Sequence, residues 1–390
     1  MRSALLVIQG TLSVALLIGA TLFVRSLIAV KAVPMGYDAS RVLIVTRVFR
    51  GAALGERSSA VRDRELMARA ATALPGVEAA SWVMSVPLWT TWRPPLFVAG
   101  IDSVERLGEF AVNATDADYF RVVGTRVLRG RALTHGDRAG TSLVVVLSES
   151  AAKALWPGKD ALGQCLRVVA DTMPCATVVG IVNDAVQNNR QLGATSRYQL
   201  YLSIAQFPPP PLSEVLLIRT RSAPMIDGES VRRALQAVMP GDSYVTVRPM
   251  RELIDNAQRP WRLGATMFVA FGVLALTVAA VGLYGVIGYD VVQRMHELGV
   301  RVALGAQRAD ILRAIVGRAV RFALVGVALG AVTAFAASRW LQPLLFQQSA
   351  TDPVVYALVA AAMLVVAVAA SATPAIRAAK ADPLTALRAD

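Results

Sequence analysis

The sequence is poor in charged residues, histidine and cysteine. Charged side chains make up 17% of the 390 residues, whereas soluble domains average about 25%. Two cysteines and two histidines are too few for a cysteine-rich or histidine-rich metal site, or for a small disulfide scaffold. Hydrophobic residues make up 55% of the chain, and this surplus needs an apolar environment to bury it. The composition therefore favours a membrane protein with a soluble domain over a soluble enzyme.

Four long stretches without charge predict transmembrane helices. Stretches of 22, 27, 17 and 24 residues without Asp, Glu, Lys, Arg or His occupy 3–24, 263–289, 322–338 and 353–376. About 20 apolar residues in a helix cross a hydrocarbon core of ~30 Å, and arginines that flank the shortest stretch can snorkel to the interface. The first stretch also fits a secretory signal peptide. Its length and the absence of an A-x-A cleavage triplet favour an uncleaved anchor at 1–25.

The distribution of Lys and Arg over the short loops predicts the orientation of these helices. Segment 290–321 carries six arginines against three acidic residues, the tail 377–390 carries three basic residues, and 339–352 carries one. Because cytoplasmic loops are enriched in Lys and Arg, 290–321 and both termini are expected in the cytoplasm. The long segment 26–262 is then expected on the other side of the membrane.

Segment 26–262 has the pattern of an α+β domain, with room for a second lobe. Short β-branched runs predict strands, and an apolar stripe that ends at Pro-Gly predicts a helix. The predicted strands are 41–49, 77–86, 143–147, 177–182 and 214–219, and the predicted helices are 56–74 and 226–239. Basic residues are scattered among acidic ones, without an aromatic-interleaved stripe, so nucleic-acid binding is not expected.

The two cysteines of the chain have the spacing of a β-hairpin. Nine residues separate Cys165 from Cys175, and a polar turn lies between two apolar runs. A cross-strand pair can reach disulfide geometry, and an oxidising compartment lets the bond persist. The alternative is a pair of buried free thiols. We predict a structural disulfide without a catalytic role.

Catalytic and metal-binding patterns are missing from the sequence. It contains neither G-x-x-x-x-G-K-[ST] nor H-E-x-x-H, and His135 and His296 are predicted on opposite sides of the membrane. The four predicted spans carry no Asp, Glu, Lys, Arg or His, which proton-coupled transporters usually require. We therefore predict a non-catalytic protein without a metal or cofactor of its own.

Segment 290–321 predicts a short helical hairpin at the membrane surface. Gly305 is suited to end its first helix. Ala309, Leu312, Ile315, Val316 and Ala319 form an apolar stripe on the second helix, and Asp310 near its start complements the helix dipole. Periodicity by itself is equally compatible with an ordinary basic amphipathic loop.

Two motifs in the C-terminal part resemble a known family. HELGVRVALGAQRADIL (296–312) and TPAIRAAKADPLTALR (373–388) are similar to signatures of the MacB/FtsX-type permeases of ABC transporters. Three stretches of the earlier segment, 118–137, 147–164 and 178–185, are similar to the periplasmic core domain of that family. The resemblance covers nearly the whole chain.

The resemblance implies a membrane α-helical fold with four transmembrane helices and a large α+β extracytoplasmic domain inserted after the first helix. The expected parts are the MacB-like domain 26–262 and the FtsX-like permease domain 263–390, in a multi-pass protein of the bacterial inner membrane. The expected partners are an ABC ATPase subunit and a second permease unit, identical or different. ATP hydrolysis by the partner is expected to move the outer domain, a mechanotransmission that serves efflux or extraction of a substrate. The residues expected to contact the ATPase are Glu297, Leu298, Gly299, Arg301, Ala303, Leu304, Gly305 and Ala306.

Two alternatives stay open at this point. The chain is also compatible with a membrane-anchored regulator of an extracytoplasmic partner, such as a cell-wall hydrolase, without transport. Its opening stretch resembles the start of the second half of duplicated orphan permeases, in which case the chain is one half of a split permease and its partner is a different half.

Overall fold

The chain folds into a helical unit and a sheet domain. The computed structural model describes residues 2–49, 57–188, 197–207, 214–221, 228–239, 243–294, 297 and 307–379. Residues 1–32 and 258–390 belong to the helical unit, and residues 33–257 form the sheet domain. Each unit has its own hydrophobic core, so each is described by itself.

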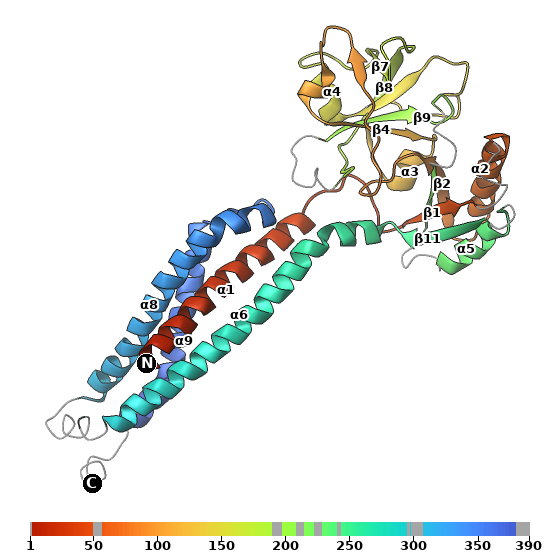
Figure 1. The fold of residues 1–390 in the computed structure, drawn as a ribbon. Helices are drawn as coiled ribbons and strands as arrows, with labels where there is room; N and C mark the ends of the chain where they lie inside the picture. The colour runs from red at the N-terminus through yellow and green to blue at the C-terminus, as the bar shows by residue number, and fades with distance from the viewer. Residues whose placement is uncertain are drawn as a thin grey trace. The chain divides into compact units, whose positions relative to one another are not determined.

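Four long helices form the helical unit (Figure 1). They are α1 (Arg2–Lys31), α6 (Arg251–Gln293), α8 (Arg308–Leu341) and α9 (Pro353–Ala379), and a single 3-10 turn, η4 (Gln342–Leu344), follows α8. Each of the four is long and apolar enough to cross a membrane. Together with the sheet domain that lies between α1 and α6 in the chain, they confirm the predicted fold class.

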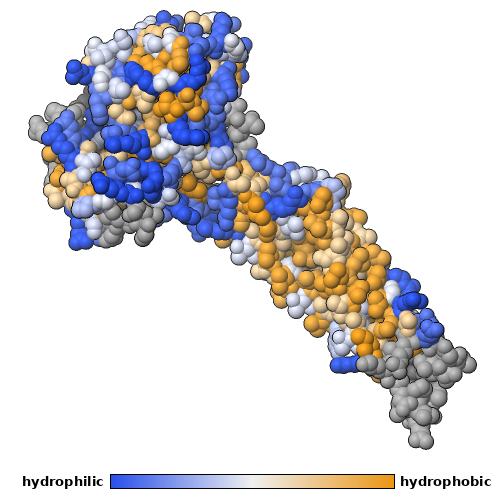
Figure 2. Space-filling view, turned by 180° about the vertical axis from the view of Figure 1, so that it is seen from behind, coloured by the Kyte–Doolittle hydropathy of each residue, from blue (hydrophilic) through white to orange (hydrophobic). Residues whose placement is uncertain are grey.

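The outer surface of the helical unit is apolar. Leu274, Val281, Phe335 and Val365 expose 61%, 65%, 64% and 68% of their surface. Figure 2 shows hydrophobic residues covering this part of the molecule, with hydrophilic residues near the end of the helices. A continuous apolar belt of this kind is unfavourable in water, and it is the surface that a bilayer solvates.

Glycines let α1 and α8 approach closely. A Cβ atom on Gly326 would lie 3.2 Å from the Cα atom of Gly10, and a Cβ atom on Gly330 would lie 2.5 Å from the Cβ atom of Val14. The G-x-x-x-G pair in α8 therefore packs against α1 of the same chain. Small residues at such positions allow helix backbones to meet inside a membrane, where packing replaces the hydrophobic effect.

Polar contacts fasten the end of α1 to the segment between α8 and α9. Arg25 Nη1 lies 2.6 Å from Asp352 Oδ2. The buried Phe346 N–H donates to Ser26 Oγ over 3.2 Å. Nearby, the ring of Phe23 stacks on Phe268 of α6 with 4.9 Å between centroids. These contacts connect three parts of the helical unit at its 25–31 end.

The sheet domain is built on one mixed sheet of eleven strands. The strands are β1 (Val42–Val48), β2 (Val77–Val83), β3 (Leu96–Val98), β4 (Phe110–Thr115), β5 (Val127–Gly130), β6 (Val144–Ser148), β7 (Cys165–Val168), β8 (Ala176–Val182), β9 (Tyr198–Ser203), β10 (Val215–Thr220) and β11 (Tyr244–Pro249). Their order is β11-β1-β10-β2-β4-β9-β6-β8-β7-β3, with β5 paired to β8. The β4–β9 and β6–β8 pairs are parallel and the others are antiparallel.

Both faces of the sheet are covered around β1. Strand residues alternate between the two faces, so Leu43 and Val45 face α2 (Arg57–Thr72) and α5 (Gly228–Gln236), whereas Val42 and Ile44 face α3 (Tyr119–Val123). All four side chains are at most 1% exposed. This double coverage explains why β1 begins with four consecutive apolar residues, Val42 to Val45.

A second lobe uses the other half of the same sheet. Its core gathers residues of β6, β8 and β9 with α4 (Glu149–Leu155), including Leu147, Leu155, Trp156 and Leu200. Figure 1 shows α4 beside β7 and β8 in this lobe. The middle of the chain thus extends the sheet and does not form a separate layer.

The segment that follows α1 is bound along the sheet domain. Residues 33–38, here called the entry segment, pair with three separate stretches of that domain. Val186 N–H donates to Met35 O over 2.8 Å. Asn183 Nδ2 donates to Gly36 O over 3.0 Å. Gly36 has a φ of +80° and passes so close to Asp184 that an added Cβ would lie 2.0 Å from the Asp184 carbonyl oxygen.

Asp38, the last residue of the entry segment, forms an ion pair with Arg219. Asp38 Oδ2 accepts from Arg219 Nη2 over 2.9 Å, and its Oδ1 accepts from Ser40. Partial burial by itself would raise the pKa of Asp38, but the bonds from Ser40 and Arg219 outweigh it and lower the pKa to about 2. Arg219 is almost fully buried and also donates to Val122 O. The entry segment is therefore held by charge as well as by backbone pairing.

A buried ion pair lies on the face covered by α2. The Arg47 side chain is 1% exposed and its Nη2 lies 3.2 Å from Glu214 Oε2. Arg64 Nη1 lies 2.8 Å from the other oxygen of the same carboxylate, and the Arg47 guanidinium stacks 4.4 Å from the centroid of the Trp82 ring. Burial raises the pKa of Glu214 and lowers the pKa of Arg47. Such a pair is costly to break because either charge would stay buried.

Candidate coupling site at the 290–321 end of the helical unit

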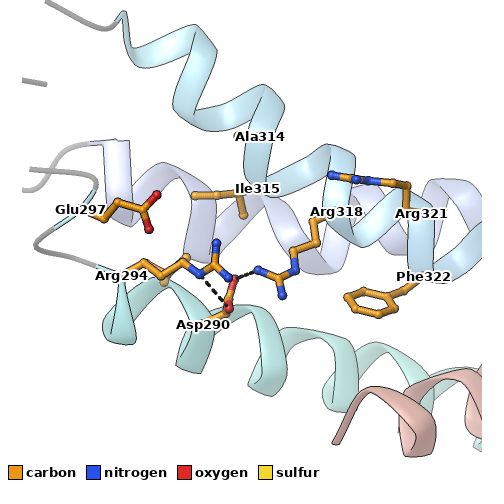
Figure 3. Close-up of a pocket in the computed structure, with 9 residues that line it drawn as sticks. Asp290, Arg294, Glu297, Ala314, Ile315, Arg318, Arg321 and Phe322 are labelled. Carbon is orange, nitrogen blue, oxygen red and sulfur yellow. Dashed lines mark hydrogen bonds and ion pairs between the residues drawn. The ribbon is translucent and has the colours of Figure 1, made fainter. Parts of the chain in front are cut away.

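A cavity opens between the end of α6 and the beginning of α8. Its volume is about 520 Å³. Figure 3 shows the arginine and acidic side chains of the two helices directed toward it. The lining residues are Asp290, Val291, Arg294, Glu297, Ala314, Ile315, Arg318, Arg321 and Phe322. Helical spacing explains the set, because residues three and four positions apart share one face of a helix.

Asp290 joins the two helices at this cavity. Its Oδ2 atom lies 2.6 Å from Arg318 Nη1 of α8, and its Oδ1 atom lies 3.3 Å from Arg294 Nε one turn further along α6. Asp290 and Arg318 are partly exposed, with side-chain exposures of 27% and 36%. One carboxylate thus pairs with two guanidinium groups, and the pair with Arg318 connects α6 to α8.

An apolar cluster lies next to the charged groups of the cavity. Leu6 of α1, Ile287 and Val291 of α6, Ile311 of α8 and Ala367 of α9 belong to one buried cluster. Residues from all four helices therefore meet there in one packed cluster.

The beginning of α8 is defined by a capping box. Gln307 N–H donates to Asp310 Oδ2 over 3.3 Å, and the Gln307 side chain accepts from the backbone of Asp310. The helix then continues without interruption from Arg308 to Leu341. The predicted surface helix and the predicted third span are therefore one helix.

Of the predicted ATPase-contacting residues, Glu297 lies within the described part of the chain. It is exposed and lines the cavity (Figure 3). The others, Leu298, Gly299, Arg301, Ala303, Leu304, Gly305 and Ala306, lie outside the described residues. The bridging role of Asp290 was not predicted from the sequence. The spacing of Asp290 and Arg294, four positions apart, was a signal for part of it.

The predicted cysteine pair lies far from this site in the chain. Cys165 and Cys175 are joined by a disulfide bond, with 5.7 Å between their Cα atoms. Cys165 begins β7, which pairs antiparallel with β8 next to Cys175. The bond closes this hairpin at the edge of the sheet. Within the described residues, no group of three or more His, Cys, Asp or Glu side chains is placed to hold a metal ion.

Two family models match the chain. Residues 269–383 match the FtsX-like permease C-terminal model, and residues 3–238 match the MacB-like periplasmic core domain. The second match by itself covers more than half of the sequence. The chain belongs to the MacB/FtsX-type permeases. The family resemblance seen in the sequence is thereby confirmed.

Curated relatives of this permease are longer than the chain. It is 26% identical over 282 residues to the macrolide export ATP-binding/permease protein MacB of Chromobacterium violaceum, which covers 69% of this chain and 42% of the relative. It is 28% identical over 255 residues to the protein of the same description from Escherichia coli, covering 60% of this chain and 36% of the relative. The permease thus spans less than half the length of these relatives.

Among solved structures, the permease is similar to the periplasmic region of MacB from Actinobacillus actinomycetemcomitans. The TM-score is 0.40 at 15% identity, and the match covers 57% of this chain and 94% of that structure.

Proposed function

We propose that this permease works with a partner ABC ATPase and converts ATP hydrolysis into movement of its sheet domain, in the service of export or extraction of a substrate. The first support is its relatives, which are described as macrolide export ATP-binding/permease proteins. In this proposal, 290–321 and both termini lie in the cytoplasm, the sheet domain lies in the periplasm, and a second permease unit completes the assembly.

The observation that carries the proposal is the continuity of α6. This helix has 43 residues, which corresponds to roughly 65 Å at 1.5 Å per residue. Its first turns belong to the sheet domain, where Leu253 and Ile254 pack against the core next to the buried Met250. Its last turn carries Asp290 of the cavity, and Arg294 follows directly after it. A single helix therefore connects the core of the sheet domain to the candidate coupling site.

A helix is suited to this role because it resists compression along its axis. Its hydrogen bonds run parallel to the axis, so a displaced end moves the other end, and Pro260 near the start of α6 marks the position at which this helix can bend. The entry segment gives the sheet domain a second attachment, to α1. Movement of α6 relative to α1 would then apply a force to the sheet domain at two points, Met250 and the 33–38 segment.

Recovery of the ATPase tests the proposal directly. The tagged permease is purified in mild detergent from its native host, and the proteins that accompany it are identified by mass spectrometry with a measurement of ATP hydrolysis. We expect an ABC ATPase that is retained by the wild type and lost on Glu297→Lys. Asp171→Lys makes the same charge change at an exposed carboxylate of the sheet domain, and it should retain the ATPase.

A second measurement separates movement of the sheet domain from simple association. Hydrogen exchange of the complex is compared with and without ATP and vanadate, and exchange is expected to change in 33–38 and 251–257. An intact permease that recruits no ATPase, and in which Glu297→Lys behaves as wild type, contradicts the proposal. If the ATPase associates but hydrogen exchange in the sheet domain stays the same, the proposed movement is contradicted. The proposed partnership with the ATPase then still holds.

A further inference from the structure

The cavity at the 290–321 end lies at the depth where the apolar part of the helices ends. On α6, the charge-free stretch runs to Tyr289 and is followed directly by Asp290. On α8, Arg321 is followed directly by the charge-free stretch that begins at Phe322. In a bilayer, this boundary coincides with the phosphate groups of the lipids, and long basic side chains extend toward them.

The charges that line the cavity are unequal in number. Among the described lining residues, Arg294, Arg318 and Arg321 outnumber the two carboxylates, those of Asp290 and Glu297, by one charge. Arg294 and Arg318 share Asp290. In the described part of the chain, the exposed Arg321 guanidinium has one hydrogen bond, from Nε to Gly317 O over 3.4 Å. Its planar fork of donors is suited to two oxygens of one phosphate.

The shape of the cavity also fits a ligand that is charged at one end and apolar at the other. Val291, Ala314, Ile315 and Phe322 supply apolar surface beside the arginines. The volume of about 520 Å³ lies within the ~300–1,000 Å³ of small-molecule sites. Basic pockets between transmembrane helices are recurrent sites for anionic lipid headgroups.

We propose that this cavity binds the phosphate headgroup of an anionic phospholipid, with Arg321 and Arg294 as its principal donors. The bound phosphate adds negative charge beside Arg321, whose guanidinium is not paired with Asp290. It also connects α6 with α8 at the point where Asp290 and Arg318 already pair. Lipid binding does not require the ATPase, so this proposal stands independently of the proposed coupling function.

Native mass spectrometry of the purified full-length chain tests the proposal. The permease is stripped of lipid in a neutral detergent and titrated with phosphatidylglycerol or with zwitterionic phosphatidylcholine. We expect tighter binding of phosphatidylglycerol to the wild type. Arg321→Gln and Arg294→Gln should each weaken it about five-fold, which corresponds to ~1 kcal/mol for one basic residue at the membrane surface. Binding of phosphatidylcholine should not change.

Arg313→Gln is the matched control. Arg313 lies on the same helix and is 82% exposed, but it does not line the cavity. This variant should bind phosphatidylglycerol like the wild type. Arg321→Lys keeps the charge and should retain most of the binding. Thermal unfolding in neutral detergent verifies that the variants are folded, since Arg321 contributes little to the packing of the helical unit.

Four outcomes would overturn the proposal. If Arg321→Gln and Arg313→Gln weaken phosphatidylglycerol binding equally, general surface charge attracts the lipid. Unchanged binding in the Arg294→Gln, Arg321→Gln double variant would place the lipid elsewhere. Displacement of phosphatidylglycerol by an equal concentration of inorganic phosphate would identify a site for a free anion. Loss of ATPase recovery with unchanged lipid binding would assign these arginines to an acidic surface of the partner protein instead.

Discussion

Replacement of Gly36 by alanine is the most direct test of how the entry segment is held. Gly36 has a φ of +80°, and an added Cβ atom would lie 2.0 Å from Asp184 O and 2.6 Å from Ala185 Cα. An alanine in this left-handed conformation costs about 1–2 kcal/mol without any contact. To relieve the contact, the entry segment must move away from 184–186, and the bonds from Val186 N–H and Asn183 Nδ2 are then lost.

Those two bonds contribute about 1 kcal/mol each, so Gly36→Ala should destabilise the sheet domain by about 3–4 kcal/mol. Gly140→Ala is the control. Gly140 has a similar φ of +86°, and nothing lies within 4 Å of its added Cβ, so this variant should cost about 1–2 kcal/mol.

The difference of about 2 kcal/mol between the variants corresponds to about 4–8 °C in the thermal midpoint for a domain of this size. The midpoint of the sheet domain is measured by calorimetry on the full chain in detergent. Hydrogen exchange reports on the Val186 amide, which is buried and bonded to Met35 O. It should exchange faster in Gly36→Ala and at the wild-type rate in Gly140→Ala. Equal midpoints and equal Val186 protection in the two variants would refute this account of the entry segment.

Three further predictions follow from the packing and the buried charges. The pKa of Asp38 is about 2 in the folded chain and about 3.9 in an unfolded one. The stabilisation from ionised Asp38 is therefore complete above the unfolded-state pKa of about 3.9 and disappears as the pH falls toward 2. Asp38→Asn should show a smaller loss of thermal midpoint than the wild type between pH 5 and pH 2.5; an identical loss would contradict this. Gly330→Ala should push α8 away from α1 and lower the midpoint of the helical unit, whereas Gly317→Ala, which meets nothing within 4 Å, should leave it unchanged or raised. Glu214→Gln leaves Arg47 buried without its counter-charge and should cost about 3–5 kcal/mol in urea unfolding, and a cost below 1 kcal/mol would show that Arg47 is compensated elsewhere.

The membrane-spanning helices could be predicted from the sequence because a long charge-free run has few ways to be buried. The predicted span at 353–376 and the observed helix α9 (Pro353–Ala379) begin at the same residue. The second span is different. The charge-free run begins at 263, but α6 begins at Arg251, because its charged first turns are held by the packing of Leu253 and Ile254 in the sheet domain.

Strands buried on both faces were predictable for a similar reason, since β1 and β10 each begin with four consecutive apolar residues. The order of the strands in the sheet was not predictable from the sequence. The parallel pairing of β4 with β9 joins residues about 90 positions apart, and nothing in either strand encodes its neighbour, because backbone hydrogen bonds are the same for every partner.

By itself, the sequence determined the family, the four apolar spans and part of the strands of the sheet domain, because hydropathy, periodicity and the 296–312 motif are local properties of the chain. Only the tertiary structure decided which charges meet. Asp290 and Arg318 are 28 residues apart, and Gly36 and Asp184 are farther apart still. These contacts depend on packing between distant segments, and the candidate coupling cavity and the fixed entry segment exist only where that packing brings them together.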